Sequence, residues 1–133
     1  MSCRSATTCI ATGSSGNADT EGTLAERWNG RKWAVQPTPN PAGSEGSELA
    51  AVYCPSATAC TAAGDYDNRS GTDVTLGERW NGTKWALQST PNPSDAEASL
   101  LTGVSCSSAT ACTAAGPSIK RSGAEPTLAE RYS

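Results

Sequence analysis

One stretch of about fifty residues is written two and a half times in this chain of 133 residues. Cys3, Cys54 and Cys106 lie 51 and 52 residues apart, and an aromatic residue recurs with a spacing of 52 at positions 28, 80 and 132. A fixed period of this length means that copies of one supersecondary unit are stacked. We therefore expect one repeat domain, with repeat 1 at about 1–47, repeat 2 at about 48–98 and a partial repeat 3 at about 99–133.

The first half of each repeat predicts two strands joined by a tight turn. In repeat 2 the strands are expected at 48–54 and 59–64, and in repeat 3 at 99–106 and 111–116, because these segments are short, apolar or β-branched, and bounded by turn residues. Small residues fill the second strand, which permits another sheet to approach closely.

The second half of each repeat predicts a further hairpin. Residues 23–28 contain good helix formers, but Asn29-Gly30 follows directly, and Asn-Gly between alternating segments favours a two-residue hairpin turn. We expect strands at 23–28 and 32–36, with the prolines at 39 and 41 ending the second. The chain is therefore expected to be all-β.

Six cysteines form three pairs with five residues inside each pair. The members of a pair would face each other across the first hairpin, where Cβ atoms approach closely enough for a disulfide. Zinc is the alternative, but this spacing and the lack of any histidine do not match common zinc sites. Disulfides imply an oxidising, extracellular location, and a signal peptide, which this chain does not show, would be removed or lie elsewhere. The expected pairs are Cys3–Cys9, Cys54–Cys60 and Cys106–Cys112.

Four short antiparallel strands in about 52 residues, with a Trp on each outer strand, are the anatomy of a β-propeller blade. A β-trefoil is the alternative, since it also has three four-stranded repeats, but repeat 3 lacks the fourth strand. The motifs Ser-Cys-x-Ser-x-x-x-Cys-x-Ala-x-Gly and Thr-Leu-Ala-Glu-Arg-Trp-Asn-Gly-x-x-Trp resemble those of actinobacterial secreted repeat proteins. This resemblance covers the whole chain and implies disulfide-bearing, propeller-like blades, mostly in proteins without an assigned function.

Two and a half blades would leave strand edges and apolar faces uncovered. We therefore expect the propeller to be closed by homo-oligomerisation, with a dimer favoured.

Composition argues against other partners. The net charge is −3 and the sequence pI is about 4.9, so no basic surface is available for nucleic acid. No run of 18 apolar residues exists, so membrane insertion is not expected.

The sequence offers little for catalysis. Glu26, Glu78 and Glu130 could be read as glycosidase carboxylates, but identical placement in three copies favours a repeated structural role. Ser118 with Lys120 is a weak alternative for nucleophilic chemistry. Aspartates near position 65 resemble part of a calcium loop, but the other repeats lack them. We expect no enzyme, no catalytic residue, no metal and no cofactor.

The loops between the second and third strands, at 14–22, 65–74 and 117–126, differ most among the repeats and are the expected binding surface. The expected function is lectin-like recognition of a glycan or cell-surface polymer. A self-assembling fragment without a ligand and a fragment of a propeller enzyme such as a glycoside hydrolase are the alternatives. The Trp rings could stack on sugars or pack between blades. The candidate ligand-binding residues are Asp65, Tyr66, Asp67, Asn68, Arg69, Lys120, Arg121, Trp33 and Trp85.

Overall fold

The computed structural model describes residues 1–17 and 19–133, and its regular structure consists of twelve β-strands. No helix capable of crossing a membrane occurs among these residues. The strands are β1 (Ser2–Ser5), β2 (Thr8–Gly16), β3 (Glu21–Trp28), β4 (Trp33–Gln36), β5 (Gly46–Ser56), β6 (Ala59–Asp67), β7 (Asp73–Trp80), β8 (Trp85–Gln88), β9 (Ala96–Ser99), β10 (Gly103–Ser108), β11 (Ala111–Lys120) and β12 (Thr127–Tyr132).

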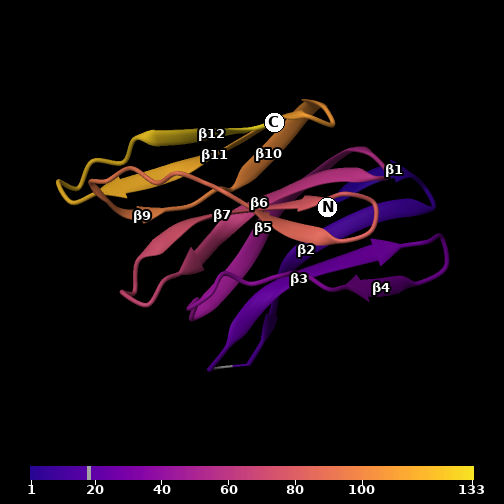
Figure 1. Cartoon of the computed structure of the whole chain (residues 1–133), viewed down its shortest axis with the longest axis horizontal. Helices are drawn as coiled ribbons and strands as arrows, with labels where there is room; N and C mark the ends of the chain where they lie inside the picture. Colours follow the sequence, from indigo (N-terminus) through magenta and orange to yellow (C-terminus); the bar gives the residue numbers. More distant parts are fainter. Residues whose placement is uncertain (18) are drawn as a thin grey trace.

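The strands form three antiparallel units that follow one another along the chain (Figure 1). Unit 1 contains β1–β4, unit 2 contains β5–β8, and unit 3 contains β9–β12. Units 1 and 2 are joined by a single parallel bridge between Glu21 and Gly46. The all-β expectation is confirmed. The described strands do not close into the barrel that a β-trefoil requires.

Each unit places its disulfide in the first hairpin. The pairs Cys3–Cys9, Cys54–Cys60 and Cys106–Cys112 are bonded, with Cα–Cα distances of 4.0, 4.0 and 3.9 Å. In units 1 and 3 the two cysteines are direct partners in the strand register, and in unit 2 they lie next to the paired residues Tyr53 and Thr61. The disulfide prediction is confirmed, which rules out the zinc alternative in this structure.

The two faces of each sheet differ because side chains alternate along a strand. We call the face that carries the disulfide the disulfide face; in unit 2 it includes Ala62, Glu78 and Trp80. We call the opposite face the threonine face; in unit 2 it includes Thr61 and Thr75. The same alternation assigns the faces of the other units.

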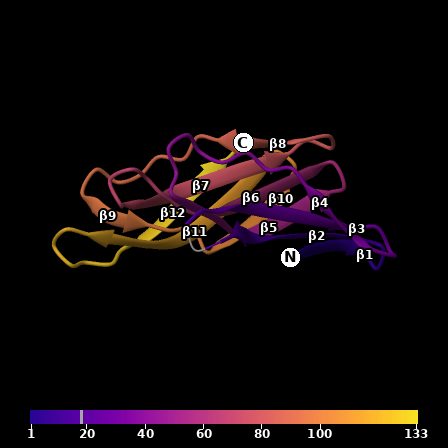
Figure 2. The same cartoon turned by 90° about the horizontal axis from the view of Figure 1, so that it is seen from below.

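Consecutive units lie beside one another (Figures 1 and 2), and the buried clusters place the threonine face of one against the disulfide face of the next. Ile10 and Ala25 of unit 1 belong to the same buried cluster as Trp80 of unit 2. Between units 2 and 3, the Thr61 hydroxyl donates to Cys112 Sγ at 3.2 Å, and Gly77 lies against the Tyr132 ring. Small side chains on the threonine face therefore let neighbouring sheets approach closely.

The turn between the third and fourth strands is longer than expected. Residues 29–32 connect Trp28 to Trp33, so the two-residue turn predicted from Asn29-Gly30 is wrong. The Asn29 side-chain oxygen accepts hydrogen bonds from the backbone N–H groups of Arg31 and Lys32, both at 3.0 Å. Only Gly30 has a positive φ, of 93°, whereas a two-residue type I′ turn needs two such residues.

The first strand of unit 3 is interrupted. The single strand predicted at 99–106 is replaced by β9 and β10, which both pair with β11. Between them Leu101 is fully buried, and its backbone N–H donates to the Gly64 carbonyl of unit 2 at 3.4 Å. A bulge beside the equivalent Leu49 marks the same place in β5. Burial of this leucine accounts for the departure from a regular strand.

Candidate functional site

The segment predicted as the loop 65–74 is largely strand. Pairing continues outward from Asp65 with Thr75 through Tyr66 with Val74 to Asp67 with Asp73. Similarly, β2 extends to Gly16 and β11 to Lys120, inside the loops predicted at 14–22 and 117–126. The connections are therefore shorter than predicted, and four candidate binding residues of these segments lie in strands: Asp65, Tyr66, Asp67 and Lys120.

Carboxylates gather at the end of β5 and β6, beside the bridge to unit 1. We call this depression the acidic hollow, and its lining residues are Glu21, Gly46, Ser47, Glu48, Asp65 and Asp67. The structure brings together the predicted Asp65 and Asp67. Glu21 of unit 1 was not predicted, and it reaches the hollow because β3 meets β5 at Gly46.

The charges in the acidic hollow repel one another. Burial, followed by the negative charges of Asp73, Glu48 and Asp67, raises the pKa of Asp65 to about 6. A hydrogen bond with the Asp67 side chain raises the pKa of Asp73 as well, with smaller contributions from burial and the charge of Asp67. The hollow therefore favours groups that donate hydrogen bonds or carry positive charge.

A buried serine lies in the same strand as Glu48, but its side chain points to the opposite face of the sheet, because Ser47 pairs with Tyr66 and Glu48 pairs with Asp65. Ser47 is only 4% exposed, and its hydroxyl has no hydrogen-bond partner among the described residues. Such a group is destabilising unless water or a ligand satisfies it. Ser47 and Glu48 were not predicted as site residues, because the expected strand began at Glu48 and its pairing was not expected to reach residues 65–67.

Asn68 and Arg69 shape the edge of this region. The Asn68 side-chain oxygen accepts hydrogen bonds from the N–H groups of Ser70 and Thr72, at 2.9 and 3.1 Å, and thereby closes the turn. Arg69 is exposed and packs over Gly43, where a side chain would collide with it. Asn68 therefore has a structural role in this turn.

Lys120 and Arg121 lie apart from the acidic hollow, in unit 3. Lys120 Nζ is 2.9 Å from Asp95 Oδ2, and the backbone N–H of Arg121 donates to the Asp95 carbonyl at 3.2 Å. The hydrogen bond from Lys120 lowers the pKa of Asp95. The candidate residues thus fall into separate groups and do not form one site.

The tryptophans occupy equivalent positions but different surroundings. Trp28 and Trp33 have ring centroids 5.7 Å apart, and Trp80 and Trp85 have centroids 5.9 Å apart. Trp85 is 4% exposed and its Nε1 donates to Gln36 of unit 1 at 3.0 Å, so it packs between units. Trp33 is 41% exposed because no unit covers the disulfide face of unit 1.

Two of the three repeated glutamates, Glu78 and Glu130, lie between units. Glu130 is 6% exposed and accepts a hydrogen bond of 3.4 Å from the Thr75 hydroxyl of unit 2. Glu78 is fully buried, and neither carboxylate oxygen has a hydrogen-bond partner among the described residues. Burial raises the pKa of Glu78 to about 7, opposed by a smaller effect of the nearby Thr23 hydroxyl. Repetition at the unit interfaces supports the structural interpretation of these residues.

We expect the unfolding free energy of Glu78→Gln, relative to that of the wild type, to be higher at pH 8 than at pH 5. A carboxyl whose pKa is raised from 4.5 to about 7 on folding contributes stability when protonated, and that contribution is lost as the pH rises through this window. The variant lacks this loss, so its advantage should grow by about 2 kcal/mol between pH 5 and 8, which is less than the full shift because the carboxyl of the unfolded chain is already mostly ionised at pH 5. Urea unfolding at both pH values measures the difference. Exposed Glu125→Gln controls for charge, and a difference that does not change with pH would contradict the expectation.

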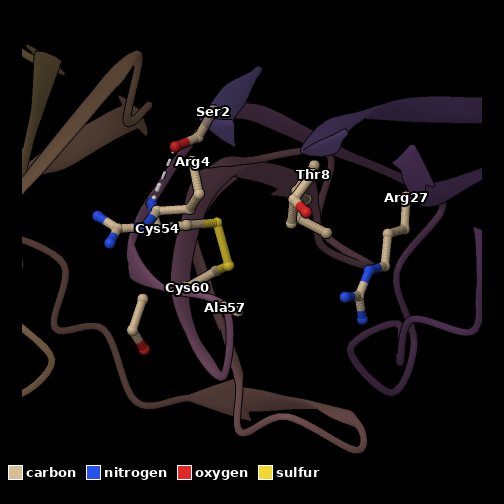
Figure 3. Close-up of a pocket in the computed structure, with 9 residues that line it drawn as sticks. Ser2, Arg4, Thr8, Arg27, Cys54, Ala57 and Cys60 are labelled. Carbon is tan, nitrogen blue, oxygen red and sulfur yellow. Dashed lines mark hydrogen bonds between the residues drawn. A yellow bond between two sulfur atoms is a disulfide. The ribbon is translucent and has the colours of Figure 1, made fainter. Parts of the chain in front are cut away.

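A small pocket lies beside the Cys54–Cys60 disulfide, where units 1 and 2 meet (Figure 3). The backbone N–H of Cys54 donates to the Ser2 hydroxyl at 3.1 Å, and Arg4 and Arg27 project nearby. Its free volume of about 10 Å³ is close to that of one water molecule. This pocket therefore belongs to the packing between units.

The described residues show no other chemical centre. Ser118 is 1% exposed and its hydroxyl lies 3.2 Å from that of Ser99, so it is committed to unit 3. Within residues 1–17 and 19–133, no three His, Cys, Asp or Glu side chains are grouped to hold a metal ion. The chain matches no protein-family model, no curated protein and no solved structure.

Proposed function

We propose that the three units are β-propeller blades, the third without its outer strand. Each complete unit is a meander of four antiparallel strands, with the pairs β1–β2, β2–β3 and β3–β4 in unit 1. Face-to-face packing of successive units through small side chains agrees with the stacking of blades. The repeat motifs and their resemblance to secreted actinobacterial proteins support the same proposal.

We further propose that the chain is a non-enzymatic, extracellular binding module that recognises a glycan. The observation that carries this proposal is the acidic hollow, where Asp65 and Asp67 line a depression together with Glu21 and Glu48. Three disulfides support an extracellular location.

The charge of the hollow narrows the class of glycan. Carboxylates accept hydrogen bonds from sugar hydroxyls and attract ammonium groups, whereas they repel sulfates and uronic acids. The protein also has a net charge of −3. We therefore propose a neutral glycan or one that contains free amino sugars, and we exclude acidic polysaccharides from the proposal.

A glycan array tests this function directly. The oxidised protein is expected to bind neutral or amino-sugar glycans, and Asp65→Asn with Asp67→Asn should reduce the signal at least about tenfold, as expected when charged hydrogen bonds are lost. The matched control is Asp95→Asn, which removes an aspartate of the separate Lys120 ion pair and should leave binding unchanged. A blank array, preferential binding to acidic glycans, or equal loss in the control would overturn the proposal.

A further inference from the structure

Among the described residues, two sheet faces remain without a partner inside the chain. Unit 2 is covered on both faces, by unit 1 and by unit 3. The disulfide face of unit 1 and the threonine face of unit 3 lie at the two ends of this stack. Because the units are repeats, these two faces are the two halves of an interface that already occurs twice in the molecule.

The disulfide face of unit 1 is less buried than the equivalent face of unit 2. Its Trp28 and Glu26 are half-buried. The equivalent residues of unit 2, Trp80 and Glu78, are 7% and 0% exposed because unit 1 covers them.

The threonine face of unit 3 shows the complementary difference. Along β11 and β12 buried and exposed residues alternate strictly over several positions, so one face is covered and the other is not. Ala63 of unit 2 is 0% exposed, whereas the equivalent Ala115 of unit 3 is exposed. The other exposed residues of this face are Gly103, Ser105, Thr113, Pro117, Thr127, Ala129 and Arg131.

We infer that the threonine face of unit 3 binds the disulfide face of unit 1 in a second copy of this chain. This occupant follows from continuity with the two internal interfaces, because both matching surfaces are encoded in one sequence. It is also independent of the glycan proposed above.

The internal interfaces supply the expected contacts. The Thr75 hydroxyl donates a hydrogen bond to Glu130 inside the chain, and we expect the equivalent Thr127 to donate to Glu26 of the second copy. Arg79 donates through Nη2 to the Ala109 carbonyl at 2.6 Å, and its equivalent is Arg131 with the Ala6 carbonyl.

The contact expected at Trp28 also has an equivalent inside the chain. Ala25 of unit 1 shares a buried cluster with Trp80, and Ala129 takes the same place against Trp28 of the second copy. Trp33 remains the less covered ring, because Trp85 is held by Gln36 of a fourth strand that unit 3 does not have.

The proposed contact is head-to-tail, because the threonine face of one copy meets the disulfide face of the other. Two copies that each present both faces satisfy all four faces when the ring closes around a two-fold axis. Such a ring contains six units, and neither terminal face remains exposed.

Paired face variants test this arrangement. Ala129→Arg places a long charged side chain on the threonine face of unit 3, and Ala11→Arg does so on the disulfide face of unit 1. Neither residue is fully buried within one chain, so both variants are expected to fold with normal circular dichroism. Ala124→Arg, in the exposed β11–β12 turn, is the control. Sedimentation velocity reports the assembly of each protein.

The expected results separate this interface from other associations. Wild type and the control should sediment as dimers, whereas each face variant should be monomeric. An equimolar mixture of the two face variants should regain dimers, because one intact interface survives between the different chains. A monomeric wild type, a dimeric face variant, or a mixture that stays monomeric would overturn the inference.

Discussion

Gly64→Ala is expected to destabilise the protein by about 3 kcal/mol or more, the upper range for steric overpacking. A Cβ at position 64 would overlap the carbonyl oxygen of Glu48 and lie 2.9 Å from its carbonyl carbon and 3.0 Å from the Ala50 nitrogen. These are backbone atoms of the paired strand, so no side chain can move to relieve the overlap. Guanidinium unfolding monitored by tryptophan fluorescence measures the loss.

The repeat provides a matched control at Gly13, which occupies the same position in unit 1. A Cβ there would have no atom within 4 Å, because β1 does not extend far enough to cover it. Gly13→Ala should therefore be neutral or slightly stabilising. Equal destabilisation by the two substitutions would contradict the strand register described for β5 and β6.

Removing the central disulfide by Cys54→Ala with Cys60→Ala is expected to reduce the unfolding free energy by about 3 kcal/mol. Closing so short a loop contributes roughly 2 to 2.5 kcal/mol in the chain-entropy model. The remainder comes from lost packing, since Cys54 and Cys60 are 4% and 2% exposed in the first core cluster. Denaturant unfolding of both proteins measures the change.

The terminal disulfide separates these two contributions. Cys3→Ala with Cys9→Ala opens a loop of the same sequence separation, but Cys3 is exposed. Its cost should therefore be closer to about 2 kcal/mol, the loop contribution alone. A central disulfide that costs no more than the terminal one would show that the core cluster is not packed as described.

Much of the fold could be predicted because the repeat confirms each local pattern more than once. Alternation and the paired cysteines predicted the hairpins and the three disulfides, and the structure confirms both. Helix propensity in residues 23–28 was overridden by strand pairing, as Trp28 aligns with both Cys9 and Trp33. The residue pattern was therefore sufficient to predict strands and disulfides whose pairing partners lie within the same repeat.

Prediction failed where partners come from another unit. Leu101 interrupts its strand because it packs toward unit 2, and no pattern within residues 99–106 shows that contact. Glu21 joins Asp65 only through the bridge between β3 and β5. The Asn29 turn differs because a side chain satisfies amides that a type I′ turn would leave to the backbone. Contacts between units therefore required the three-dimensional structure.

The molar mass of the oxidised wild-type protein in solution tests most directly whether the repeat stack continues into a second copy. Static light scattering after size exclusion is expected to give twice the chain mass of 13.6 kDa, with the same value across a range of concentrations above the dissociation constant. A discrete dimer would agree with a closed six-unit ring. A mass of 13.6 kDa at every soluble concentration would contradict it, because both terminal faces would then be stable in water without a partner.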